Sequence, residues 1–288
     1  MCVKQHAMIG GMNLPKLITI QGSARGGKGT LAKALFDDLS RDHKVHTIDQ
    51  GLKFRILAHQ ALTNGIDKED LDAIATFVGL ESTRKSVMEK LVEAASWTKE
   101  QREAQYYTLA ISNASGMVGK LPVSHDVAVG LLLDEVRAVA QDFDIILMDG
   151  RALQKYGKQL ESEGTVQYIL AIDVHCDAFV SAQRETKIFS PDDVNEAEHY
   201  SQDQTMQLLT ATRDIARRNS SDARRTRDPS LPIRGAYDFD VLHRMDETEM
   251  SWVVEAVRTN GAITIDNSNT KTPGQLTKPI VELVRALQ

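Results

Sequence analysis

The chain has 288 residues and a formal net charge of −6, with 42% hydrophobic and 26% charged residues. These proportions are ordinary for a soluble globular protein, and the acidic balance disfavours a broad nucleic-acid-binding function. No apolar run approaches the roughly 20 residues that span a bilayer, and two cysteines cannot form a disulfide framework. Residues 1–15 lack the apolar core of a signal peptide and are expected to form a flexible leader. We expect a cytoplasmic protein without membrane or nucleic-acid partners.

From residue 16 onward, short apolar runs alternate with amphipathic stretches. The apolar runs predict strands at 17–21, 45–49, 145–148, 166–173 and 262–266. Helices are expected between them, at 27–40, 51–64, 82–95, 126–141, from 177, at 203–218, at 246–258 and from 272. This alternation predicts an α/β fold with a five-stranded parallel sheet and helices on both faces.

Two regions interrupt this alternation. Residues 65–121 have mostly helical patterning, and Asp67 is the expected N-cap of their first helix. The chain turns polar from 190 to 228, and arginines then gather at 213, 217, 218, 224, 225, 227 and 234. This cluster indicates either a mobile arginine-rich lid or a solvated helix face. We favour the lid, because such an excess of positive charge is unusual in an acidic chain.

Polar or glycine residues follow the ends of several predicted strands. Gly22, Asp49, Asp149 and Asp173 each stand at such an end. Ligands of parallel sheets bind beyond the carboxyl ends of the strands. We therefore expect these four residues to line one crevice.

The first strand runs into a glycine-rich loop, Gly-Ser-Ala-Arg-Gly-Gly-Lys-Gly-Thr at 22–30. Such a loop directs backbone N–H groups and a helix N-terminus at an anion, and Lys28 adds a charge for the β- and γ-phosphates. The spacing also occurs in unrelated glycine-rich turns, but its place between a strand and a helix favours a phosphate-binding P-loop. The predicted nucleotide-binding residues are Gly22, Ser23, Gly26, Gly27, Lys28, Gly29 and Thr30.

The ending of this loop and several later motifs resemble the bacterial cytidylate kinases, which are P-loop nucleoside monophosphate kinases. In chain order the motifs are Gly-Lys-Gly-Thr at 27–30, Asp49 to Arg55, Asn113-Ala114, Asp149-Gly150-Arg151, the set Arg218, Asp222, Arg225 and Pro229, and Ile263 to Asp266. The likeness covers about 16–60, 107–232 and 261–288. Residues 65–105 look helical where the family has a β-rich insert, and residues 233–260 look like an insertion.

The resemblance implies one kinase domain at 16–288, with an acceptor-binding region at 65–121, a lid at 186–230 and an insertion at 233–260. It implies transfer of the γ-phosphoryl group of ATP, with Mg²⁺, to a small phosphorylated acceptor. The implied catalytic residues are Lys28, Arg218 and Arg225, and the implied substrate-binding residues are Asp49, Arg55, Asp149, Arg151 and Asp222. Arg55 and Arg151 would clamp the acceptor phosphate, since planar guanidinium groups suit an oxyanion. No side chain is predicted to be a metal ligand.

The positions that read the base in cytidylate kinases differ in this chain. By ungapped local comparison they are Gln50, Gly116, His125 and Ala152. A site built to hydrogen-bond one base edge rejects others strongly, so these changes predict altered base specificity. Two alternatives stay open: a kinase for a non-nucleotide hydroxyl acceptor, and a catalytically weak nucleotide-binding regulatory module.

Overall fold

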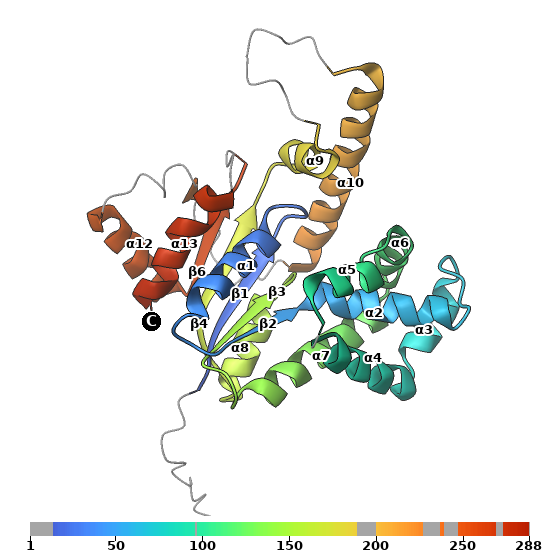
Figure 1. Cartoon of the computed structure of the whole chain (residues 1–288), viewed down its shortest axis with the longest axis horizontal. Helices are drawn as coiled ribbons and strands as arrows, with labels where there is room; N and C mark the ends of the chain where they lie inside the picture. The colour runs from blue at the N-terminus through green and yellow to red at the C-terminus, as the bar shows by residue number, and fades with distance from the viewer. Residues whose placement is uncertain are drawn as a thin grey trace, which may run out of the picture.

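A parallel β-sheet forms the centre of the computed structural model, which describes residues 14–95, 97–188, 200–226, 237–238, 247–268 and 273–287 (Figure 1). Its strands are β1 (Lys16–Gly22), β2 (Val45–Asp49), β3 (Ile145–Asp149), β4 (Gln167–His175), β5 (Tyr237–Asp238) and β6 (Ala262–Asp266), in the order β2-β3-β1-β4-β6-β5. The five predicted strands and their parallel arrangement are confirmed. The two-residue edge strand β5 was not predicted, because so short a pairing leaves no periodic pattern in the sequence.

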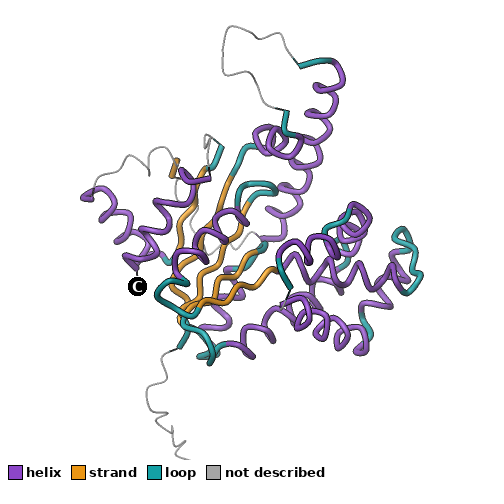
Figure 2. The backbone as a smooth tube through the Cα atoms, viewed as in Figure 1, coloured by secondary structure: helices purple, strands orange, loops and turns teal. Residues whose placement is uncertain are grey.

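Helices cover both faces of this sheet (Figure 2). Helices α1 (Lys28–Leu39), α12 (Glu247–Asn260) and α13 (Pro273–Leu287) pack on one face, whereas α7 (Pro122–Val139) and α8 (Gln154–Ser162) pack on the other. Strand β1 serves both cores, since Ile18 and Ile20 face α1 while Leu17 faces α7 and α8. This two-sided burial explains why the strands read as continuous apolar runs.

The predicted insertion at 233–260 supplies α12 to the first of these cores. Val253, Val254 and Val257 of α12 are buried against the sheet and α13, so this part of the chain belongs to the main domain. The neighbouring Trp252 is 69% exposed and is not a core residue. Residues 233–236 and 239–246 lie outside the described part of the chain.

A second core lies in a helical subdomain beside the end of β2. It is built by α2 (Gln50–Thr63), α3 (Leu71–Val78), α4 (Glu81–Ala95), α5 (Lys99–Tyr106), α6 (Leu109–Val118) and the first half of α7. Tyr106 is fully buried there and stacks on Trp97 at 5.8 Å between ring centroids. The described part of this subdomain is helical throughout, as the pattern of 65–121 predicts.

Two helix starts in this subdomain differ from the sequence-based expectation. Asp70, and not Asp67, caps α3, because its Oδ1 accepts the Ala73 N–H at 2.9 Å. Asp67 instead accepts the Glu69 N–H within the preceding turn. Helix α7 begins four residues before the expected Asp126, at Pro122, since proline is suited to the first turn of a helix.

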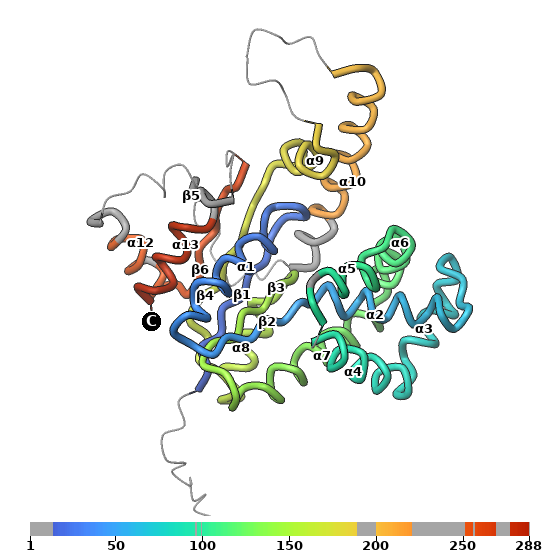
Figure 3. Tube along the Cα trace, viewed as in Figure 1, coloured from blue at the N-terminus to red at the C-terminus, as the bar shows by residue number. Residues whose placement is uncertain are grey.

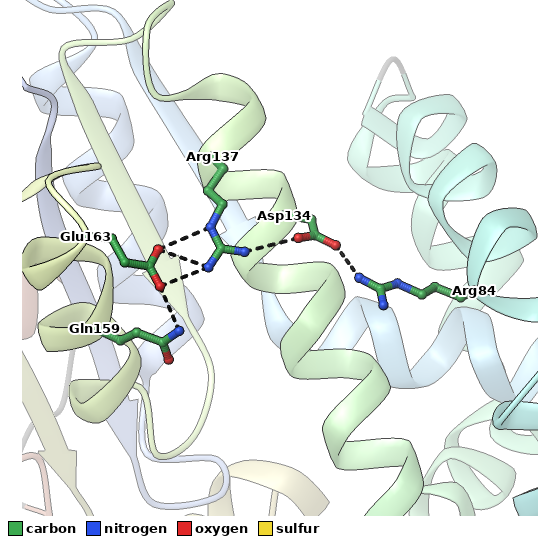
Figure 4. A network of polar contacts seen from close by, with 5 residues as sticks. All are labelled: Arg84, Asp134, Arg137, Gln159 and Glu163. Carbon is green, nitrogen blue, oxygen red and sulfur yellow. Dashed lines mark hydrogen bonds and ion pairs between the residues drawn. The ribbon is translucent and has the colours of Figure 1, made fainter. Parts of the chain in front are cut away.

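Helix α7 connects the two cores, and a chain of polar contacts runs across it (Figure 4). Arg84 of α4 donates to Asp134, which also accepts from Arg137 on the same helix. Arg137 in turn donates to Glu163, which follows α8, with the shortest N···O distance at 2.9 Å. These side chains are partly exposed to solvent, so we expect each ion pair to contribute little free energy while the network links α4, α7 and α8.

Helices α9 (Ala178–Thr186) and α10 (Gln202–Thr226), together called the arm, project from the carboxyl edge of the sheet (Figure 3). Helix α10 is eight residues longer at its C-terminus than predicted, because polar residues after 218 hide the helical pattern. Helix α10 lies within the predicted lid at 186–230, whereas α9 precedes that range except for its last residue, Thr186. Of that range, residues 189–199 and 227–230 lie outside the described chain, and the side chains of 221–226 do so as well.

A buried lysine near the end of β2 forms an ion pair with α7. Lys53 of α2 is 1% exposed, and its Nζ donates to Glu135 Oε2 at 2.6 Å. His46 lies 3.4 Å from the other carboxylate oxygen. Burial alone would raise the pKa of Glu135, but the hydrogen bonds and charges of His46 and Lys53 outweigh it, and the pKa falls below its ordinary value.

We expect Lys53→Met to lower the free energy of unfolding by about 3 kcal/mol, because it leaves a largely buried carboxylate without its cation. The double variant Lys53→Met/Glu135→Leu should recover most of this loss, whereas Lys90→Met, at an exposed pair, should change little. Because the pKa of Glu135 is lower in the folded than in the unfolded protein, ionised Glu135 stabilises the fold at pH values above 4.5. This contribution is lost as the pH falls below 4.5. Urea unfolding at pH 4 and pH 7 measures both effects; equal losses in the single and double variants would contradict them.

Candidate active site

The loop at 22–30 leaves β1 in a conformation that glycine makes possible. Gly22 has φ +128° and Gly27 has φ +98°, values that side chains with a Cβ rarely adopt. Lys28 folds back so that its Nζ donates to the carbonyl oxygens of Gly22 at 3.1 Å and Ser23 at 2.7 Å. Gly27, the N-cap of α1, makes no side-chain capping hydrogen bond, and the positive end of the helix dipole lies at this loop. The loop therefore has the chemistry of an anion cradle.

Residues from two other strands fix this loop. The Ser23 N–H donates to the Val174 carbonyl at 2.9 Å, and its Oγ accepts from the N–H of Cys176 at 3.2 Å. Asn267, which follows β6 and is 3% exposed, donates from Nδ2 to the Gly26 carbonyl at 2.7 Å. Sequence reasoning missed Asn267, because its contact with the loop joins residues 241 positions apart.

Three predicted carboxylates lie along the carboxyl edge of the sheet. Asp49 and Asp149 are paired in register at the ends of β2 and β3. Asp173 lies two residues before the end of β4, not at its end, and is level with Gln21 at the start of the loop. The predicted crevice thus has Asp49 and Asp149 on one side of the loop and Asp173 on the other.

The electrostatics of this edge are unusual. Burial and the nearby charge of Asp49 raise the pKa of Asp149 to about 7, although Lys28 and Arg151 pull it down. Burial also raises the pKa of Asp173, against the opposing charges of His175 and Lys28. Carboxyl groups whose pKa values are raised by burial are often found at functional sites.

Arg55 belongs to a cluster at the start of the helical subdomain. Asp49 Oδ1 accepts the Gly51 N–H at 2.6 Å, which caps α2, while its Oδ2 accepts from the Tyr107 hydroxyl at 2.8 Å. The Arg55 guanidinium lies 4.1 Å from the centroid of the Tyr107 ring and donates to Ser112 Oγ at 3.0 Å. Tyr107 and Ser112 were not predicted; Ser112 directly precedes Asn113-Ala114, and Tyr107 lies six residues before Asn113.

Arg151 lies in a turn after β3 that a hydrogen bond with Gln50 stabilises. Gln50 is 6% exposed, and its Oε1 accepts the Arg151 N–H at 2.7 Å. A Cβ added at Gly150 would lie 2.5 Å from that oxygen, so the turn and the amide are tightly fitted. Ala152 follows with φ +57°, and the Leu153 N–H donates to Gln21 Oε1 at 2.8 Å.

The remaining predicted residues are only partly described. Arg218 is exposed on α10, and Thr30 is exposed in the first turn of α1. Positions 222 and 225 lie on the same helix as Arg218 at one- and two-turn spacing, but the side chains of Asp222 and Arg225 lie outside the described part. Their proposed roles therefore stay predictions.

The oxygen ligands at this edge suit a magnesium ion that is coordinated mainly by the phosphates of a nucleotide. Within the described ranges, no three His, Cys, Asp or Glu side chains form a metal-binding group. The site instead offers the Thr30 hydroxyl and carboxylates on separate strands. Mg²⁺ typically keeps several waters and takes one or two carboxylates together with substrate phosphates, so the residues present fit it.

The parallel sheet, the loop and the polar edge define an α/β protein with a P-loop kinase fold. No family model matches the chain. The chain is similar to the cytidylate kinases of Brucella suis and Brucella ovis, each 27% identical over 237 residues, which is 82% of this chain and 87% of either relative. It is thus a distant relative of the cytidylate kinases, a likeness that supports a kinase-like phosphotransferase. None of the described helices is long and apolar enough to cross a bilayer.

We expect Gly22→Ala to destabilise the protein by at least about 2 kcal/mol, because a Cβ at this φ would overlap the Val174 carbonyl. Gly29→Ala is the matched control for folding: nothing lies within 4 Å of the added methyl group, and alanine favours the helix. Thermal unfolding without nucleotide compares the two. Equal melting temperatures for both variants would contradict the role given to Gly22.

We expect Asp149→Asn to stabilise the protein at pH 8 while abolishing activity. The folded pKa of about 7 lies above the unfolded value, so ionised Asp149 costs stability as pH rises from 4 to 7. The asparagine removes this cost, a gain on the order of 2 kcal/mol that should fade toward pH 4. Melting temperatures at pH 5 and pH 8 measure this gain. Asp126→Asn, at an exposed position, is the control for removing a carboxylate elsewhere. A gain that does not grow with pH would contradict the assignment.

Proposed function

We propose that this chain transfers the γ-phosphoryl group of ATP to a nucleoside monophosphate other than ordinary CMP. The observation that carries the proposal is the arrangement of the Lys28 cradle beside Asp149, Asp49 and Arg55 on one edge of the sheet. The distant likeness to cytidylate kinases supports the same reaction class.

Phosphoryl transfer needs positioning and charge neutralisation more than covalent chemistry from the protein. When bound, Mg²⁺-ATP would supply the transferable phosphoryl group, and the metal would supply positive charge that offsets the charge of the phosphates. The loop N–H groups and the N-terminus of α1 bind the donor phosphates, and Lys28 exchanges its loop carbonyls for phosphate oxygens. The hydrogen bonds of the loop with Val174, Cys176 and Asn267 keep these groups in place, so binding needs no further reorganisation of the loop.

The acceptor side has its own fixed groups. Arg55 is held between the Tyr107 ring and Ser112, so its guanidinium has little conformational freedom left to lose when it binds an anion. Asp49 orients Tyr107 and caps α2 with the same carboxylate. Arg151 follows the turn that Gln50 braces. Two guanidinium groups on rigid elements suit the phosphate of a small acceptor.

The proposed change of base specificity is supported by how the four differing positions are used. The Gln50 amide oxygen is already occupied by the Arg151 N–H. His125 packs against Phe54, and its Nε2 lies 2.8 Å from the Gly119 carbonyl. Gly116 and Ala152 have no polar side chain. A cytosine edge would therefore lack the partners that a dedicated site provides, which costs orders of magnitude in selectivity.

ADP release with a panel of nucleoside monophosphates and non-nucleotide hydroxyl compounds tests this proposal. We expect turnover with a nucleotide acceptor, poor use of CMP, and a loss in kcat of about 100-fold or more in Lys28→Ala. Lys33→Ala, an exposed lysine one turn further along α1, should leave the rate unchanged.

Each alternative has its own signature in this assay. Efficient and selective phosphorylation of CMP would contradict the change of specificity. Tight ATP binding without turnover on any acceptor would favour a regulatory nucleotide-binding module. Full activity of Lys28→Ala would contradict the cradle.

A further inference from the structure

The face of α10 that packs toward the phosphate loop carries the side-chain amide of Asn219. Leu208 and Ile215 are almost fully buried in a small apolar cluster with Ala24 and Ala182. Asn219 follows Ile215 by four residues and so continues the same face of the helix. A polar residue at this position of a buried seam requires a partner.

That partner is the phosphate loop itself. Asn219 Oδ1 accepts the backbone N–H of Ala24 at 2.9 Å. The Ala24 side chain is buried in the apolar cluster of the arm, and the next residue, Arg25, forms an ion pair with Glu185 of α9 at 3.2 Å. The outer end of the loop is thus held by the arm through three contacts of different kinds.

Only one of these contacts is both directional and sheltered. The Arg25 and Glu185 side chains are 59% and 36% exposed, so their attraction is weak and screened. Apolar packing is non-directional and allows a helix to rotate or slide. The hydrogen bond from Ala24 needs the Asn219 amide near one position, and it therefore fixes the rotation of α10 about its own axis.

We propose that Asn219 is a positioning residue that couples the phosphate loop to α10, so that a nucleotide in the loop orders the helix that carries Arg218. The inference rests on the proposed function for its effect on catalysis, but the coupling itself does not need turnover. Arg218 directly precedes Asn219, so its direction depends on the rotation that this bond sets. A misplacement of about 1 Å in a catalytic group can cost 100-fold in rate.

Hydrogen exchange with ADP as the probe tests the coupling. In the wild type, ADP should slow amide exchange at Ala24 and along residues 208–219 of α10. Asn219→Leu keeps the apolar seam but removes the acceptor; it should keep protection of residues 26–30 and lose about tenfold of the protection in α10, the loss expected for one hydrogen bond. Asn219→Asp, which keeps an acceptor oxygen, should restore it, and the exposed neighbour Ser220→Ala is the control.

Kinetics test the effect on catalysis. Asn219→Leu should lower kcat by about 10- to 100-fold with little change in the KM for ATP, and Asn219→Asp should recover most of the rate. If Asn219 acts through Arg218, the same substitution should cost much less in an Arg218→Ala background.

The outcomes separate this inference from the proposed function. If the wild type turns over no acceptor, the proposed function fails and the exchange experiment alone decides the coupling. Unchanged protection of α10 by ADP in Asn219→Leu overturns the inference even where turnover is normal. Additive losses in the double variant would overturn the action through Arg218.

Discussion

The close approach of Gly22 to the backbone of β4 is the constraint on which the site depends. At this position the chain has φ +128°, and a side chain would collide with the Val174 carbonyl. Because the loop leaves β1 in this way, Ser23 reaches Val174 and Cys176, and Lys28 can fold back over the loop carbonyls. Strand β4 therefore shapes the loop, although no residue of β4 belongs to the glycine-rich motif.

The proposed acceptor side depends on a different junction, the point where β2 is followed by α2. Asp49 ends the strand, caps the helix and accepts from Tyr107, so one carboxylate joins the sheet to the helical subdomain. Lys53 lies one turn further on and anchors the same helix to Glu135 of α7. Helix α7 is shared by both cores, which places the two halves of the crevice on one continuous framework.

The strands other than β5, the glycine-rich loop and the helical character of 65–121 could be predicted from the sequence, because each rests on a local apolar pattern or a contiguous motif. Tyr107, Asn219 and Asn267 could not, since each acts through contacts with residues far away in the chain. The start of α3 was misplaced because Asp67 and Asp70 both have cap chemistry, and tertiary structure decides between them. The roles of Asp222 and Arg225 stay predictions, because their side chains lie outside the described structure.

Gln50 has a consequence for how such a site can change over evolutionary time. The resemblance to cytidylate kinases predicts that this position reads the base, yet in this chain the Gln50 side chain supports the backbone of the turn that carries Arg151. Under the proposed function, a substitution there would alter acceptor choice and the position of Arg151 together. An ancestral route between two acceptors would then pass through a poorly active intermediate unless the turn at 149–152 changed in the same lineage. Specificity at this position is thus epistatic with the geometry of a neighbouring strand end.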